Sequence, residues 1–121
     1  MKYNTITKSI LVIDDEISIL NLLETAISRC GYNVDTATNG KAGIQKIENN
    51  EYSLIITDIK MPGISGDQVL DYLRNKIKKS TPIIGMSGTP WLLKQNDFDA
   101  ILQKPCLMGE IIEVMNQWIK K

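Results

Sequence analysis

The chain has 121 residues, 43% of them hydrophobic, and its 14 basic and 14 acidic residues cancel to a formal net charge of zero. This length fits one domain with its own core, so we expect a single domain over residues 1–121. Balanced charge argues against direct nucleic-acid binding, the polar start lacks a signal-peptide core, and no apolar run is long enough to span a membrane. We therefore expect a soluble, cytoplasmic protein with no membrane partner.

The residue types present limit the chemistry. Because the chain contains no histidine, triads with a histidine base and histidine-ligated zinc or iron sites are excluded. Cys30 and Cys106 lie far apart and form no C-x-x-C pair, so we expect both to be reduced packing residues. Any chemistry here depends on carboxylates, hydroxyls and lysine.

The first half of the chain alternates strand and helix patterns. Residues 10–13 are an unbroken apolar run that ends at an aspartate, as in a strand buried on both faces. Apolar residues at helical spacing follow over 17–30, and a glycine closes this segment. A strand at 33–37 and a helix at 39–48 repeat the pattern.

The alternation continues through the second half. Residues 54–57 predict a third buried strand, which a turn-rich loop joins to a helix that includes residues 69–77. Residues 82–86 predict a fourth strand. Lys76, Lys78 and Lys79 cluster near the end of the third helix, where cations favour the helix dipole, and we interpret them as a solvated helix end.

The last third contains a short helix, a strand and a final helix. Thr89 and Pro90 are typical of an N-cap and a first helical residue, but this fourth helix can extend only to about Asn96. Residues 100–102 predict the fifth strand, and apolar spacing over 111–118 predicts a fifth helix. Repeated β-α units favour an α/β fold with a five-stranded, doubly wound parallel sheet and helices on both faces.

Polar residues directly follow four of the predicted strands. In open parallel sheets, ligands bind outside the carboxyl ends of the strands, so these residues are the site candidates. They are Asp14, Asp15, Asp58, Ser87 and Lys104. Each alone is typical of a turn, a cap or the surface, but together they predict one pocket. Three carboxylates repel one another unless a lysine and a hard cation neutralise them, and magnesium suits such an oxygen-only site.

This arrangement resembles the receiver domain of two-component response regulators over nearly the whole chain. The matching stretches are Ile-Leu-Val-Ile-Asp-Asp-Glu at 10–16, Leu-Ile-Ile-Thr-Asp-Ile-Lys-Met-Pro-Gly at 54–63 with Gly66, Ser87-Gly88, and Lys104-Pro105. The resemblance implies a single receiver domain with a chemotaxis-regulator-like, flavodoxin-like fold of strand order 2-1-3-4-5. It also implies a signalling phosphoacceptor rather than an enzyme that turns over a separate substrate.

Residue by residue, the resemblance implies that Asp58 is the phosphoacceptor. Asp15, Asp58 and the backbone carbonyl of Lys60 would ligate Mg²⁺, and Asp14 would act mainly through a bound water. Lys104 would contact the phosphoryl oxygens. Ser87 would hydrogen-bond the phosphoryl group, while amides of Gly88 and Lys60 complete its cradle.

The implied partners are a donor and an output protein. Because the chain has no histidine, a phosphohistidine donor must belong to a partner, either a sensor histidine kinase or a histidine phosphotransfer protein. The output partner is not specified by any motif. Met1 and the end at Lys121 favour a stand-alone unit.

Three features depart from the family pattern. Ile101 occupies the position of the usual switch tyrosine or phenylalanine, and Cys106 replaces the common aromatic residue after Lys-Pro. The segment between Ser87 and Lys104 is also several residues shorter than usual. These departures affect the output face, so we keep as an alternative a receiver-like interaction module with little phosphorylation-driven switching.

Two other classes share parts of the pattern. Phosphatases of the haloacid dehalogenase type have an Asp-x-Asp motif at the end of the strand that carries the nucleophile. Here Asp58 and Ile59 are followed by Lys60, so the second aspartate of that motif is missing. A flavodoxin-like flavin carrier needs a neutral phosphate loop after the first strand, where this chain has Asp14, Asp15 and Glu16. Carboxylates there would repel a phosphate.

Overall fold

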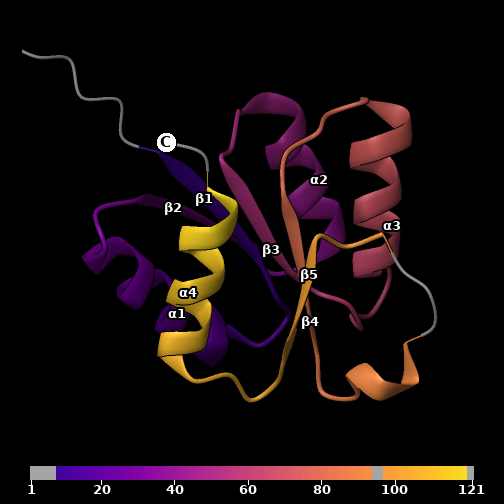
Figure 1. Ribbon diagram of the computed structural model, residues 1–121. Coiled ribbons are helices and arrows are strands. Elements are labelled where there is room, and N and C mark those ends of the chain that lie inside the picture. Colours follow the sequence, from indigo (N-terminus) through magenta and orange to yellow (C-terminus); the bar gives the residue numbers. More distant parts are fainter. Residues whose placement is uncertain (1–7, 94–96, 120–121) are drawn as a thin grey trace, which may run out of the picture.

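The computed structural model describes residues 8–93 and 97–119, which form alternating strands and helices (Figure 1). The strands are β1 (Ser9–Ile13), β2 (Asn33–Ala37), β3 (Leu54–Asp58), β4 (Ile83–Ser87) and β5 (Ala100–Gln103). The helices are α1 (Ile17–Arg29), α2 (Gly40–Asn49), α3 (Gly66–Asp71), the π-helix η1 (Tyr72–Lys76), the 3₁₀ helix η2 (Pro90–Leu92) and α4 (Met108–Trp118).

The strands form one parallel sheet of order β2-β1-β3-β4-β5, which confirms the predicted topology. The pairing register aligns the carboxyl ends of the strands: Ile13 pairs with both Ala37 and Thr57, and Ser87 pairs with Gln103. Because all strands run the same way, the residues that follow them meet at one edge of the sheet.

Helices cover both faces of the sheet. Side chains alternate along β1, so Ile10 and Val12 pack with α1 and α4, whereas Leu11 and Ile13 pack with α2 and α3. Figure 1 shows these two helix pairs on opposite sides of the strands. Burial on both faces explains why β1, β3 and β4 are almost continuously apolar in the sequence.

The third predicted helix is present but does not remain α-helical. Ser65 caps α3, because its hydroxyl accepts from the backbone N–H of Gln68, and the Gln68 side chain accepts from the Ser65 N–H. After Asp71 the backbone widens into the π-turn η1. The Arg74 guanidinium then donates to the carbonyl of Thr81 at 2.8 Å, which ties this turn to the start of β4.

The predicted fourth helix is present only as one short 3₁₀ turn in the part that the structure describes. Pro90 does start a helical turn, but η2 ends at Leu92, and Leu93 has extended backbone angles. Thr89, at the N-cap position, makes no side-chain cap hydrogen bond. The rest of that prediction, residues 94–96, lies outside the described residues. Among the described residues the helix predicted fourth is thus the 3₁₀ helix η2, and the other four predicted helices correspond to α1, α2, α3 with η1, and α4.

No helix within residues 8–93 and 97–119 is both long and apolar enough to cross a membrane.

Cys106 is half-buried, and its thiol donates to the carbonyl of Gln103, whereas Cys30 is exposed. The prediction that Cys30 is a packing residue is therefore wrong. Its backbone N–H instead closes the end of α1 by donating to the carbonyl of Ile27.

Candidate functional site

All five predicted strand-end residues lie at the carboxyl edge of the sheet, the lower edge in Figure 1. Asp14 and Asp15 follow β1, Asp58 and Ser87 are the last residues of β3 and β4, and Lys104 follows β5. They come from four separate strands, so only the folded sheet brings them together.

Three carboxylates form the centre of the site. One oxygen each from Asp14, Asp15 and Asp58 lie within 4.8 Å of one another, a group that could hold a metal ion. Asp14 is fully buried and Asp58 is 6% exposed, while Asp15 is open to solvent. Such crowding of oxygen ligands fits a hard divalent cation and provides no soft ligand for zinc or copper.

Lys104 is the cation that the chain itself supplies. Its ammonium lies 3.0 Å from Asp14 Oδ2, 3.3 Å from Asp58 Oδ2 and 3.3 Å from Glu16 Oε1. The Lys104 backbone N–H also donates to the carbonyl of Ser87 at 2.8 Å, which fixes the start of the side chain beside the end of β4. The peptide bond to Pro105 is cis.

The charges of the site shift two pKa values. Burial, together with the nearby Asp14 charge, raises the pKa of Asp58 to about 6, although Lys104 acts in the opposite direction. Burial alone would lower the pKa of Lys104, but its hydrogen bond and charge interaction with Asp14 and the charge of Asp58 raise it. At neutral pH Asp58 is therefore an ionised but destabilised carboxylate next to an ammonium group.

Ser87 lies at the end of β4 and is buried. Its hydroxyl oxygen accepts from the backbone N–H of Thr89 at 3.0 Å, which folds the following loop over the strand end. Gly88, between them, is exposed, and a Cβ atom there would meet no other atom within 4 Å. Gly88 is therefore not confined by neighbouring atoms on the side where a Cβ would lie.

The β3–α3 loop requires a glycine at Gly66. A Cβ atom on Gly66 would lie 2.5 Å from the Asp58 carbonyl oxygen and 2.8 Å from the Ile59 Cα. The Gly66 N–H also donates to the Ile59 carbonyl at 2.8 Å. This close approach folds the loop containing Lys60 back against the end of β3, so the Lys60 backbone stays near the carboxylates.

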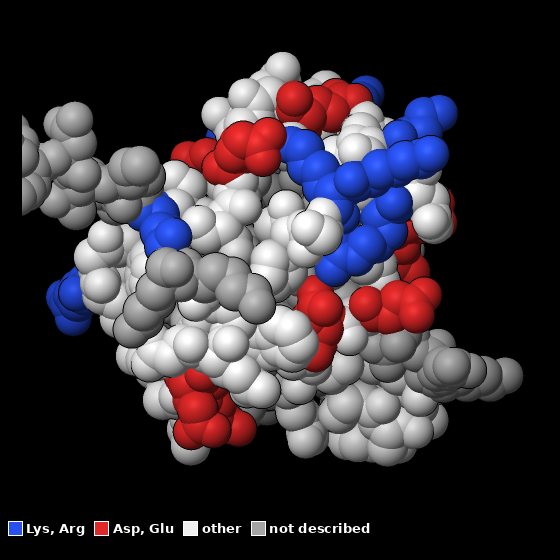
Figure 2. All heavy atoms as spheres, turned by 45° about the horizontal axis from the view of Figure 1, so that its top comes forward, with Lys and Arg blue, Asp and Glu red and all other residues white. Residues whose placement is uncertain are grey.

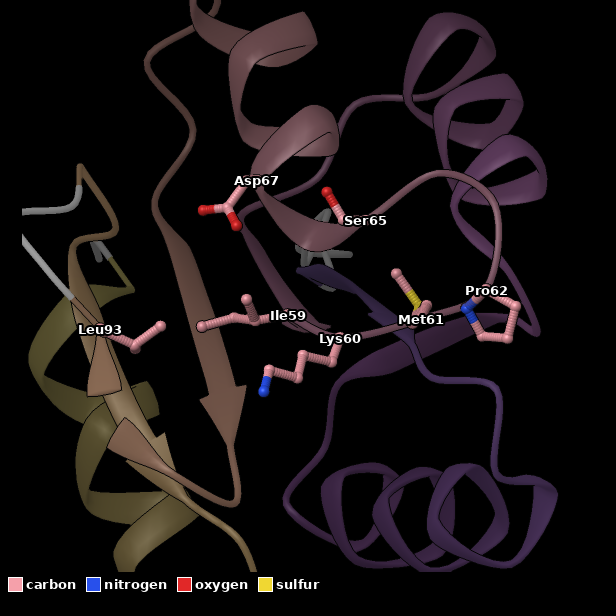
Figure 3. A pocket seen from close by; sticks show the side chains of 7 residues that line it. All are labelled: Ile59, Lys60, Met61, Pro62, Ser65, Asp67 and Leu93. Carbon is pink, nitrogen blue, oxygen red and sulfur yellow. The ribbon is translucent and has the colours of Figure 1, made fainter. Parts of the chain in front are cut away.

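Next to this loop is a hollow of about 490 Å³ that sequence reasoning missed (Figure 3). Apolar side chains of Ile59, Met61 and Leu93 line it together with the charged side chains of Lys60 and Asp67. In Figure 3 the Lys60 side chain extends toward the Leu93 side. Leu93, which lines one side of the hollow, has extended backbone angles.

Ile101 lies over the same face of the sheet as this loop. It pairs with Gly85, and a Cβ atom on Gly85 would lie 3.1 Å from the Ile101 Cδ1 and 2.8 Å from the Ile59 Cδ1. The missing side chain at Gly85 thus leaves space that both isoleucines fill. The sequence indicated the unusual residue at Ile101 but not its contact region.

The lysine cluster lies away from the site. Figure 2, which brings the upper end of Figure 1 forward, shows Lys and Arg side chains gathered on one side with Asp and Glu beside them. Lys79 pairs with Glu51 at 2.9 Å in a hollow that Lys78 also lines. The local charges are mixed, which agrees with the interpretation as a solvated helix end.

Comparison with known proteins decides the family. The sequence profile of the response regulator receiver domain matches residues 10–116. The chain belongs to this family. The phosphatase and flavin-carrier alternatives are set aside by this match, and the order and direction of the strands agree with it.

Curated receiver proteins are similar over much of this chain. The alkaline phosphatase synthesis transcriptional regulatory protein PhoP of Bacillus subtilis (strain 168) is 37% identical over 95 residues, which are 78% of this chain and 37% of PhoP. The transcriptional regulatory protein ResD of the same strain is 44% identical over 79 residues, 65% of this chain and 32% of ResD. The chain spans about a third of the length of these relatives.

Solved structures share the fold. The response regulator protein TrrA from Thermotoga maritima, in complex with Mg²⁺-BeF, has a TM-score of 0.84 and 35% identity, covering 93% of this chain and 100% of TrrA. The chemotaxis response regulator CheY4 of Vibrio cholerae has a TM-score of 0.84, covering 94% of this chain and 100% of CheY4. At 23% identity, CheY4 supports the fold alone.

Proposed function

We propose that Asp58 accepts a phosphoryl group in this receiver domain, with Lys104 and Ser87 assisting. The observation that carries the proposal is the placement of Asp58: a nearly buried carboxylate, beside two further aspartates and 3.3 Å from the Lys104 ammonium. Burial and like charge destabilise the ionised carboxylate. The acyl phosphate formed by the transfer carries more negative charge still, so the reaction depends on Lys104 and a divalent cation to offset that charge.

In the proposed transfer, a carboxylate oxygen of Asp58 forms a bond to phosphorus. The bond from phosphorus to the donor nitrogen or oxygen breaks, and the donor atom keeps the electron pair. Lys104 stabilises negative charge on the phosphoryl oxygens, because its ammonium already lies within reach of Asp58 Oδ2. Ser87 would turn its hydroxyl from the Thr89 amide toward the phosphoryl group.

The donor set fits Mg²⁺. Asp15, Asp58 and the backbone carbonyl of Lys60 would hold the ion directly, and Asp14 would hold it through a water molecule. The oxygen-only chemistry of the cluster and its excess negative charge support this assignment, as does the Mg²⁺-BeF complex of the TrrA relative. When bound, the ion supplies charge neutralisation for the carboxylates and the phosphoryl oxygens.

We further propose that a partner phosphohistidine is the donor and that phosphorylation alters contacts with an output protein. The chain has no histidine to serve as its own donor. Since Ile101 has neither a hydroxyl nor a ring, the response would pass mainly through the loop after Ser87 toward η2. Trp91 in η2 is 68% exposed and can report that change by fluorescence once Trp118 is replaced by Phe.

Intact-mass measurement after incubation with acetyl phosphate tests the proposal. We expect the wild-type chain to gain the mass of one phosphoryl group when Mg²⁺ is present and to gain none when EDTA removes it. Asp58→Asn should gain no phosphoryl group. Asp67→Asn is its matched control, because Asp67 is exposed and lies outside the carboxylate cluster, and it should be phosphorylated like the wild type. Phosphate gained equally with EDTA would contradict the proposed site.

A further inference from the structure

A fourth carboxylate, that of Glu16, reaches into the site. Its Oε1 atom accepts a hydrogen bond from the Lys104 ammonium at 3.3 Å. Glu16 is not among the residues that could hold the metal, nor among those assigned to phosphoryl binding. Its contact with Lys104 therefore has no role in the function proposed above.

The backbone around Glu16 explains why its side chain can turn toward Lys104. Glu16 occupies the N-cap position of α1 but makes no side-chain cap. Its backbone N–H donates instead to Asp14 Oδ1 at 2.9 Å. The same aspartate accepts from Lys104 through its other oxygen, Oδ2, so Asp14 holds both residues in one arrangement.

Burial changes steeply along this arrangement. The Asp14 side chain is fully buried, Lys104 is 16% exposed, and Glu16 is 59% exposed. The Lys104 ammonium thus lies between two buried carboxylates and one carboxylate at the mouth of the pocket. A phosphoryl group on Asp58 would carry about −1.5 to −2 charges and would compete with Glu16 for this ammonium.

We propose that Glu16 is a positioning residue that holds Lys104 toward the mouth of the pocket in the unphosphorylated state. This inference rests on the proposed function, because Lys104 must leave Glu16 when it contacts the phosphoryl oxygens. Glu16 then sets how readily the site accepts a phosphoryl group. Removing its carboxylate frees the ammonium, so the affinity for a phosphoryl mimic rises.

Beryllofluoride binding in the presence of Mg²⁺, followed by ¹⁹F NMR, tests this inference. We expect Glu16→Gln to bind beryllofluoride about twofold to fivefold more tightly than the wild type, the range for an ion pair with one exposed partner. Glu24→Gln is the matched control, since Glu24 is exposed on α1, and its affinity should equal that of the wild type. A Glu16→Gln affinity that is unchanged or weaker overturns the inference.

A double-mutant cycle separates positioning from a general charge effect. If Glu16 acts through Lys104, Glu16→Gln has no effect in a Lys104→Gln background. If Glu16→Gln raises beryllofluoride affinity equally in both backgrounds, Glu16 acts only through its negative potential, and that result overturns the inference.

Glu16→Asp tests whether Glu16 positions Lys104 without changing Lys104 itself. It keeps the charge but shortens the reach by one methylene, so it should resemble Glu16→Gln. Affinity equal to that of the wild type would contradict positioning. A wild-type chain that binds no beryllofluoride at all contradicts the proposed function itself, before any Glu16 variant is compared.

Discussion

Replacing Asp58 with Asn should stabilise the metal-free fold. Asp58 is 6% exposed, and the charge of Asp14 repels its ionised carboxylate. The attraction to Lys104 offsets only part of the cost of this burial and repulsion. Asn keeps nearly the same shape and removes the charge. Asp58→Asn is therefore expected to be more stable than the wild type as long as Mg²⁺ is absent.

The size of the effect follows from the pKa of Asp58, which is raised from 3.8 to about 6. A shift of about 2 units corresponds to about 3 kcal/mol at neutral pH, because each unit is worth about 1.4 kcal/mol. Water in the open pocket reduces this value, so we expect a gain of about 2 kcal/mol in the free energy of unfolding. For 121 residues that is about 8 °C in Tm.

The pH dependence has a definite sign. Between pH 4 and 6 the folded chain binds more protons at Asp58 than the unfolded chain does, so this group makes stability fall as pH rises. Its destabilising effect is complete above pH 6 and disappears as pH falls toward 4. The difference between Asp58→Asn and the wild type should shrink over the same range.

Urea unfolding in EDTA at several pH values measures this difference. Asp67→Asn is the control, because Asp67 is exposed in the first turn of α3, where its charge favours the helix dipole. It should change stability slightly and in the opposite direction. An Asp58→Asn protein no more stable than the wild type at pH 7 would refute the argument from burial and repulsion.

Three further predictions concern the metal, the lysine and the loop. Magnesium at tenfold its Kd should raise the free energy of unfolding by about 1.4 kcal/mol, and an unchanged thermal midpoint in the millimolar range would contradict a formed site. Lys104→Ala should keep Mg²⁺ binding but lose about tenfold or more in beryllofluoride affinity in a titration, and an undiminished affinity would remove Lys104 from its proposed role. Gly66→Ala should cost about 1–3 kcal/mol in denaturant unfolding, because its Cβ would lie 2.5 Å from the Asp58 carbonyl oxygen. Gly109→Ala is its control, since a Cβ there meets nothing within 4 Å; equal stability of the two variants would show that the loop relaxes freely.

The sequence was sufficient for the strands and their ends, and the physical reason is burial. A strand covered by helices on both faces is apolar at nearly every position, so its last residue is marked by the first polar one. Asp14 after β1 and Ser87 at the end of β4 could be located this way. The topology then brought them to one edge, and the family match supports the whole arrangement.

The sequence was not sufficient where tertiary contacts decide the backbone. The apolar spacing over 69–77 fits a helix, but it does not show that Tyr72–Lys76 widens into a π-turn whose Arg74 bonds to the α3–β4 connection. Pro90 correctly marked a helical start. The apolar pattern after Pro90 did not show that the turn ends at Leu92, where Leu93 becomes extended.

Side-chain contacts across the site were also beyond the sequence. Spacing alone cannot show that Glu16 lies 3.3 Å from the Lys104 ammonium, because the two residues belong to opposite ends of the chain.

Locating the phosphoryl group tests the central claim most directly. After incubation with acetyl phosphate and Mg²⁺, borohydride reduction converts an aspartyl phosphate to homoserine, which peptide mass spectrometry can place in the sequence. We predict homoserine at position 58, between Thr57 and Ile59, and at neither Asp14 nor Asp15. Homoserine at another aspartate, or none in a chain that had gained phosphate, would contradict the assignment of Asp58 as the phosphoacceptor.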